Sequence, residues 1–117
     1  MVPRMQDKRD NERVSILGEL QGEMMLFQPM LVRDLSRSGV TVDTRFPLQI
    51  NSLHDIRLTL GNTSIIVKGR VVHSRVTEMD QDLLMYRTGM EFVEPSTAVV
   101  GAVHEFLAAV KANRSGV

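Results

Sequence analysis

Two arginines, Arg9 and Arg13, lie four residues apart in a charged N-terminal segment, and their side chains could bind an anion. A guanidinium is a planar fork of donors that matches a phosphate, and it also matches the O6 and N7 acceptors of guanine. Residues four apart project about 13 Å apart in an extended segment but only about 6 Å apart in a helical turn. A flexible segment could therefore bring both arginines onto one compact ligand. In isolation, the same arginines could instead pair with Asp7, Asp10 and Glu12 on a solvated surface.

A second group of polar residues, Asp34, Ser36 and Gly39, forms a DxSxxG pattern where one expected strand gives way to the next. Because side chains alternate along a strand, Asp34 and Ser36 should share a face while Leu35 points into the core. A carboxylate can accept the N1–H and N2–H donors of guanine, and a hydroxyl can donate or accept. Gly39 is expected to supply either a positive φ or room for a close backbone approach. Asp and Ser also end strands in ordinary turns, so only the combination with the two arginines favours a ligand site.

Short β-strands are the elements that would position these residues. Ile56, Leu58 and Leu60 alternate with polar residues, which is the period-2 pattern of a half-buried strand. Gly61 and Asn62 then predict a two-residue hairpin turn, because both residue types tolerate positive φ. The run 64–76 should place Ile65, Val67 and Val71 on one side and Lys68, Arg70 and Ser74 on the other. Further strands are expected over 14–20, 24–33 with Pro29 interrupting it, around Val40–Val42, and over 84–92.

The C-terminal segment is expected to be helical over about 96–113. Six apolar residues after Pro95 recur at i, i+3, i+4 and i+7 spacing, which is typical of one face of an α-helix. Ser96 or Thr97 can cap its start. We expect this helix to pack on the strands, and a partner-binding helix is the alternative. The apolar residues are Val99, Val100, Val103, Phe106, Leu107 and Val110.

Length and composition restrict the remaining possibilities. The 117 residues fit one domain, expected over 14–117, preceded by a polar and flexible arm over 1–13. The 14 basic and 14 acidic residues cancel, which argues against a surface for DNA or RNA. Neither a signal peptide nor an apolar stretch long enough to cross a bilayer is visible, so a cytoplasmic location without membrane insertion is expected. The chain has no cysteine, its three histidines lack metal-ligand spacing, and no catalytic motif is visible, so we expect neither a metal site nor an enzyme.

Taken together, RxxxR and DxSxxG in this order and spacing resemble the PilZ domain family, whose members combine RxxxR with [DN]xSxxG some twenty to thirty residues later. The segment from Tyr86 to Phe92, with Gly89 inside it, is similar to a late GxxF-like strand of that family. A closing helix follows here as it does in the family. The resemblance covers nearly the whole chain, from about Lys8 to Val110.

The resemblance implies a mostly β fold, a six-stranded antiparallel barrel with a C-terminal helix and a flexible N-terminal arm. It also implies that the ligand is cyclic di-GMP, which docks outside the barrel while the arm wraps over it, with no further cofactor. Ordering of the arm would then be the output signal. The candidate ligand residues are Arg9, Arg13, Asp34, Ser36 and Gly39, with Lys8 and Gly89 as secondary candidates. At Gly89, the missing side chain would leave space beside a guanine.

Other functions remain as alternatives. A PilZ-like adaptor could bind a motility or pilus protein without any nucleotide, and a downstream protein partner is expected even for a receptor, in the regulation of motility or biofilm formation. An unrelated β-barrel that binds nucleic acid would need a basic stripe, which the neutral composition does not supply. Only 4% of the residues are aromatic and none is tryptophan, so stacking on a base would rely on guanidinium planes.

Overall fold

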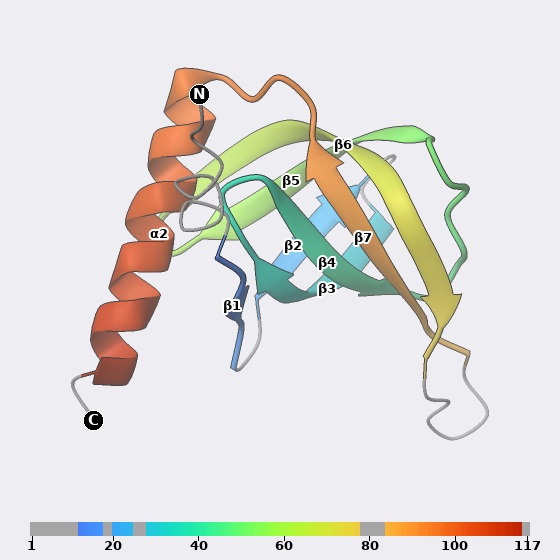
Figure 1. Cartoon of the computed structure of the whole chain (residues 1–117), viewed down its shortest axis with the longest axis horizontal. Helices are drawn as coiled ribbons and strands as arrows, with labels where there is room; N and C mark the ends of the chain where they lie inside the picture. The colour runs from blue at the N-terminus through green and yellow to red at the C-terminus, as the bar shows by residue number, and fades with distance from the viewer. Residues whose placement is uncertain (1–11, 18–19, 25–27, 78–83, 116–117) are drawn as a thin grey trace, which may run out of the picture.

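The computed structural model describes residues 12–17, 20–24, 28–77 and 84–115, and within them six antiparallel strands form a barrel beside one helix (Figure 1). The pairings run from β3 through β2, β5, β6 and β7 to β4, and β4 pairs back with β3 to close the ring. The six-stranded barrel predicted from the sequence is therefore confirmed. These strands are β2 (Gln21–Met24), β3 (Gln28–Leu35), β4 (Gly39–Thr44), β5 (Leu53–Leu60), β6 (Thr63–Val76) and β7 (Tyr86–Phe92).

A short seventh strand, β1 (Val14–Ser15), pairs with the end of β3 outside the ring. The expected strand over 14–20 is therefore much shorter than predicted. One edge of β3 is shared between two segments, because β1 pairs with Asp34 and Leu35 while β2 pairs with residues 28–31. Ser15 lies opposite Asp34 and Gln21 opposite Leu31, so six residue steps correspond to only three along β3 and the pairing is not one continuous ladder.

The interior of the barrel is filled by the apolar residues of the alternating strands. Ile56, Leu58 and Leu60 of β5 point inward as the period-2 pattern predicted, and all three are buried. Each buried Val, Leu or Ile side chain contributes about 1.5–3 kcal/mol relative to an exposed one. The other buried apolar residues of the strands are Val14, Met30, Val32, Leu35, Val40, Val42, Ile65, Val67, Val71 and Met90.

Two bulges change which side chains face outward. The register of β6 against β7 shifts between Val71 and His73, so one extra residue is inserted there. Ser74, which the alternation placed outside with Lys68 and Arg70, therefore faces inward and its hydroxyl lies 2.8 Å from that of buried Thr88. The prediction for Ser74 was wrong because a bulge is not visible in a pattern of apolar residues. A second bulge shifts β3 against β4 between Val32 and Asp34.

Pro29 lies inside a strand, not at an interruption. The expected strand over 24–33 was wrong in its start, because Met24 ends β2 and Gln28 begins β3. Val32 donates its N–H to the Leu20 carbonyl beside β2. Since alternate residues direct their N–H groups to the same side, the nitrogen of Pro29 faces away from β2, past the end of β4. The missing donor at Pro29 therefore breaks no ladder hydrogen bond.

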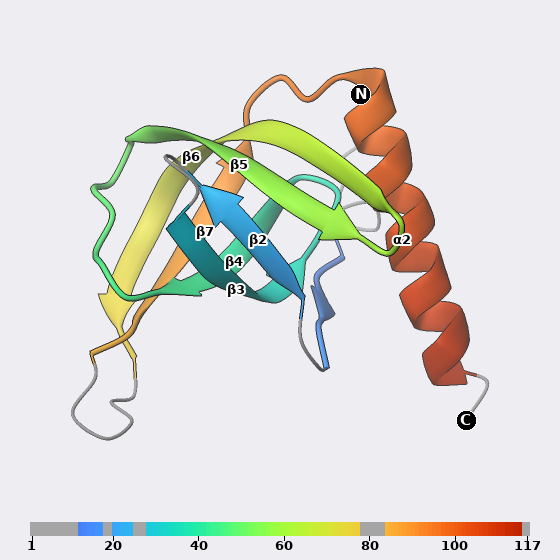
Figure 2. The same cartoon turned by 180° about the vertical axis from the view of Figure 1, so that it is seen from behind.

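Helix α2 (Thr97–Ser115) lies against the β5–β6 side of the barrel (Figure 2). Of the two predicted caps, Ser96 is the one used, since its hydroxyl accepts the N–H of Val99 at 3.2 Å. Val99, Val103 and Leu107 are buried against the barrel, which confirms the predicted packing of this apolar face. Among the described residues, no helix is long and apolar enough to cross a membrane.

Candidate functional site

Arg13 and Asp34 bring the two sequence motifs together. The Nη1 of Arg13 donates to Oδ1 of Asp34 at 3.0 Å, across a separation of 21 residues. The short strand β1 causes this contact, because its pairing with the end of β3 sets Ser15 opposite Asp34 and leaves Arg13 one step before the strand. Their side chains are 48% and 27% exposed, so both remain accessible from solvent. Arg9 and Lys8 lie outside the described residues.

A row of four residues runs across the outside of the barrel from Asp34. The strand registers set Asp34 of β3 opposite Thr41 of β4, Thr41 opposite Gly89 of β7, and Gly89 opposite His73 of β6. We call these four residues the central row. Neighbouring strands lie about 4.8 Å apart, so the row is about 14 Å long. Small residues in the middle and polar side chains at both ends make a surface on which a compact, flat ligand could rest.

The space above Gly89 is occupied by a side chain of the protein itself. A Cβ at Gly89 would lie 2.2 Å from Nε2 of His73 and within 3 Å of two further ring atoms. The glycine therefore makes room for the imidazole, where the sequence predicted room for a guanine. A base that reaches Gly89 must displace this ring or stack on it. The histidine was set aside in the sequence because only the cross-strand register shows that it belongs to the central row.

Ser36 and Gly39 serve the turn between β3 and β4. The hydroxyl of Ser36 accepts the N–H of Gly39 at 3.1 Å and that of Ser38 at 3.2 Å, and the side chain is fully buried. The predicted shared face of Asp34 and Ser36 is therefore wrong, because β3 ends at Leu35 and Ser36 already belongs to the turn. Leu35 is fully buried, as predicted.

Gly39 allows a close approach of two backbones. A Cβ there would lie 2.3 Å from the carbonyl oxygen of Met90, and Gly39 is not among the described residues with positive φ. Of the two roles predicted for this glycine, close approach is the one observed. Its partner is strand β7 of the barrel.

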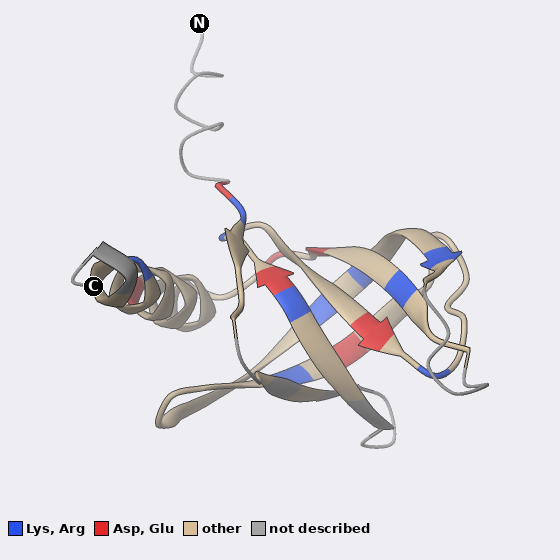
Figure 3. Cartoon of the chain, turned by 90° about the horizontal axis from the view of Figure 1, so that it is seen from below, with Lys and Arg blue, Asp and Glu red and all other residues tan. Residues whose placement is uncertain are grey.

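Charged residues flank the central row on both sides, and basic and acidic positions lie next to each other on neighbouring strands (Figure 3). On one side, Arg70 of β6 donates to Glu91 of β7 at 2.8 Å. On the other side, the buried carboxylate of Asp43 accepts two hydrogen bonds from Arg87, at 2.8 and 3.1 Å. Arg33 approaches the same carboxylate at 3.6 Å.

The start of the described chain also contacts the helix. Glu12 forms an ion pair with Lys111 of α2, while its neighbour Arg13 pairs with Asp34 of β3. Successive residues thus connect the arm to two different elements. A ligand that moves Arg13 would also act on the contact between Glu12 and the helix.

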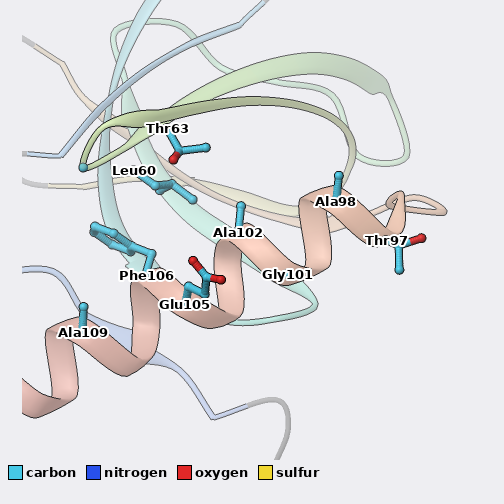
Figure 4. Close-up of a pocket in the computed structure, with 10 residues that line it drawn as sticks. Leu60, Thr63, Thr97, Ala98, Gly101, Ala102, Glu105, Phe106 and Ala109 are labelled. Carbon is cyan, nitrogen blue, oxygen red and sulfur yellow. The ribbon is translucent and has the colours of Figure 1, made fainter.

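Other features of the structure do not fit a dinucleotide or a metal ion. A cavity of about 490 Å³ between α2 and the β5–β6 turn is lined mostly by small and apolar residues such as Leu60 and Phe106, with the carboxylate of Glu105 among them and no arginine (Figure 4). His54 lies at the start of β5, where burial lowers its pKa below the usual 6.5. No group of three or more potential metal ligands occurs in the part of the chain that the structure describes.

Comparison with known proteins gives a consistent assignment. The sequence profile of the PilZ domain matches residues 3–109. The PilZ domain of YcgR from Escherichia coli, solved with c-di-GMP, has a TM-score of 0.74 at 13% identity, and the match covers 92% of this chain and 94% of that chain. No curated protein sequence gives a significant match.

Two longer proteins share the same fold. MrkH of K. pneumonia in its apo state matches with a TM-score of 0.73 at 17% identity, covering 89% of this chain and 52% of that chain. The inhibitor of motility MotI/DgrA of Bacillus subtilis matches at 0.72 and 15% identity, covering 97% and 57%. The chain therefore spans little more than half the length of these two proteins. At such identities the likeness shows a shared fold.

Proposed function

Since the chain belongs to the PilZ domain family, we propose that it is a non-catalytic, cytoplasmic receptor for cyclic di-GMP, which binds outside the barrel on the central row. The YcgR domain, which shares this fold, was solved with that nucleotide. The observation that carries the proposal is the ion pair between Arg13 and Asp34, because it joins the RxxxR and DxSxxG motifs at one place on the surface.

The chemistry of this pair suits a guanine nucleotide. Asp34 can accept the N1–H and N2–H donors of guanine, and Arg13 can donate to a phosphate or to O6 and N7. Without ligand, the two side chains satisfy each other at 3.0 Å. Binding then exchanges one charged contact for two, one from the carboxylate to the base and one from the guanidinium to the ligand. Arg9, and Lys8 in a lesser role, would add donors from the arm.

In this proposal the remaining motif residues, Ser36 and Gly39, contribute by holding Asp34 in position. Ser36 holds the turn by accepting two backbone N–H groups, and Gly39 lets that turn approach β7. Together they keep Asp34 at the end of β3 beside β1. Gly89 and His73 form the other end of the surface, where the ring of His73 is exposed.

The output would be a change in the arm. Arg13 moves when it exchanges Asp34 for the ligand, and Glu12 beside it is paired with Lys111 of α2. Binding thereby stabilises one arm position and loosens or strengthens its contact with the helix, which a partner protein could sense. Protease cleavage within residues 1–13 should decrease when cyclic di-GMP is added, and unchanged cleavage would contradict this output.

Calorimetric titration of cyclic di-GMP into the chain tests the receptor function, with Arg13→Ala in parallel. Loss of a buried charged contact costs about 2–5 kcal/mol, so affinity should fall roughly 30-fold or more. Arg57→Ala is the matched control, because this arginine lies on β5, away from the central row, and its loss should leave affinity unchanged. Absence of binding by the parent, with no change in melting temperature, would favour the ligand-independent adaptor.

A further inference from the structure

A second row of charged residues lies next to the central row on the same outer surface. The registers set Asp43 of β4 opposite Arg87 of β7, and Arg87 opposite Arg75 of β6. Asp43 and Arg87 each lie two residues along their strands from Thr41 and Gly89. This arginine row is therefore about 7 Å from the central row, within reach of one ligand.

Among the described residues, the arginine row contains more basic than acidic side chains. Arg33 and Arg87 lie 3.6 and 2.8 Å from the carboxylate of Asp43, and Arg75 stands opposite Arg87 on the next strand. Three arginines therefore accompany one carboxylate here, in a chain whose 14 basic and 14 acidic residues cancel. Arg75 stands directly opposite Arg87, and like charges in opposite positions destabilise a sheet. Both hydrogen bonds of Asp43 come from Arg87. Pairing with Asp43 therefore does not explain why an arginine stands at position 75.

The contact with Asp43 also prepares Arg87 to bind. Two hydrogen bonds at 2.8 and 3.1 Å hold the plane of its guanidinium, so little further rotamer freedom is lost when an anion arrives. Arg75 is exposed, and within the described part of the chain it makes no ion pair. One fixed guanidinium beside one adaptable guanidinium can hold an anion between them.

The opposite side of the central row provides the contrast. There Arg70 is also exposed, but it is paired with Glu91 at 2.8 Å and its charge is compensated. Along β7 the two sides are equally far from Gly89, since Glu91 and Arg87 each lie two residues from it. Among the described residues, Arg75 on the other side has no such ion pair, so its charge is available for an anion.

We infer that Arg75 and Arg87 form an anion subsite that binds a phosphodiester of cyclic di-GMP while the ligand lies on the central row. The inference rests on the proposed function and adds to it two residues outside both sequence motifs. The phosphodiester belongs either to the ligand held by Arg13 and Asp34 or to a second ligand molecule beside it. The stoichiometry of binding distinguishes these two sources.

The test is titration of cyclic di-GMP into the parent and into Arg75→Gln and Arg70→Gln variants at low and high salt. Arg75→Gln should weaken binding about tenfold, or reduce two bound molecules to one, because a charged hydrogen bond to the phosphate is lost. Its affinity should also depend less on salt than that of the parent. Arg70→Gln should bind as the parent does. Arg87 is left unchanged because its removal would take both of its hydrogen bonds away from buried Asp43.

Stability measurements separate a binding role from a structural one. Without ligand, Arg75→Gln should melt at the same temperature as the parent or slightly higher, since it removes a repulsion between opposite arginines. Equal affinity, stoichiometry and salt dependence in Arg75→Gln and the parent would overturn the subsite and leave the receptor function standing. A parent that binds no cyclic di-GMP would overturn both.

Discussion

Two turns of the barrel contain a glycine, and the two glycines serve opposite purposes. Gly61, in the turn between β5 and β6, has a φ of 63°, and a Cβ there would meet no atom within 4 Å. Gly39, where the turn between β3 and β4 meets the strand, is not among the residues with positive φ, yet its Cβ would lie 2.3 Å from the Met90 carbonyl oxygen. The first glycine is required by its own backbone and the second by a neighbouring strand.

The β5–β6 turn therefore depends on residues close in the sequence, whereas the β3–β4 turn also depends on a strand far away in the sequence. The β5–β6 turn is a two-residue hairpin in which the strands it joins pair directly with each other. The β3–β4 turn also packs on β7, since the N–H of Phe92 donates to the carbonyl of Ser38 at 2.8 Å. The DxSxxG motif, interpreted from the sequence as a ligand-binding pattern, thus also packs the β3–β4 turn against β7.

Gly39→Ala should have the largest effect on stability. The added methyl group meets a backbone carbonyl that cannot rotate away, so β4 and β7 must separate, and overpacking of this kind costs about 3 kcal/mol or more. Chemical denaturation would measure the loss. A stability equal to that of the parent would show that the close approach is not a constraint.

Ser36→Ala should have the next largest effect. Loss of the hydroxyl leaves the N–H groups of Ser38 and Gly39 without their acceptor, which costs about 1–3 kcal/mol when such groups are buried. The matched control is Ser38→Ala: this residue is exposed, and its hydroxyl has a long contact of 3.4 Å with that of Ser36 but accepts neither of these backbone N–H groups, so its loss should cost little. Equal denaturation midpoints for both variants would argue against a role of Ser36 in the turn.

Gly61→Ala should cost only about 1 kcal/mol, because the strain lies in the left-handed backbone alone and there is room for the methyl group. Gly61→Asn should recover part of that loss, since asparagine tolerates this conformation better than alanine. Thermal melting of both variants against the parent measures the difference. A loss as large as that of Gly39→Ala would remove the distinction between the two turns.

A third turn, held by the hydroxyl of Ser52, should make stability depend on pH, with the smallest effect of the series. Ser52 donates its hydroxyl to the Gln49 carbonyl and therefore accepts from Nε2 of His54, at 2.8 Å. Burial lowers the pKa of His54 in the folded chain, so below 6.5 the unfolded chain binds more protons. Stability should fall as pH drops from 7 through 6.5 toward the folded pKa and then level off.

Melting temperatures between pH 5 and 8 measure this dependence, and His54→Gln should reduce its slope. An unchanged slope in His54→Gln would assign the pH dependence to other groups. The other turns contain no histidine and should contribute nothing in this range.

The residues of the candidate site also fall into two groups: those that local sequence patterns identify and those that only contacts between distant segments reveal. The sequence named Arg13 and Asp34 by type and spacing, and the structure places them in contact at 3.0 Å. It assigned Ser36 to the wrong face because the end of β3 was not visible, and it passed over His73 because a cross-strand register cannot be read from one strand. Arg9 and Lys8, outside the described residues, stay predictions.

By itself the sequence determined the strongly alternating strands of the barrel, the turn at Gly61, the C-terminal helix with a cap at Ser96 or Thr97, and the combination of the two motifs as a candidate site. These depend on periods of two or 3.6 residues and on the conformational freedom of single residues, which are local properties. Only the tertiary structure decided the bulges, the close approach at Gly39, and the rows that gather His73, Arg75 and Arg87 beside Gly89. Strand register and closure of the barrel set these neighbours, and both arise from contacts between segments far apart in the chain.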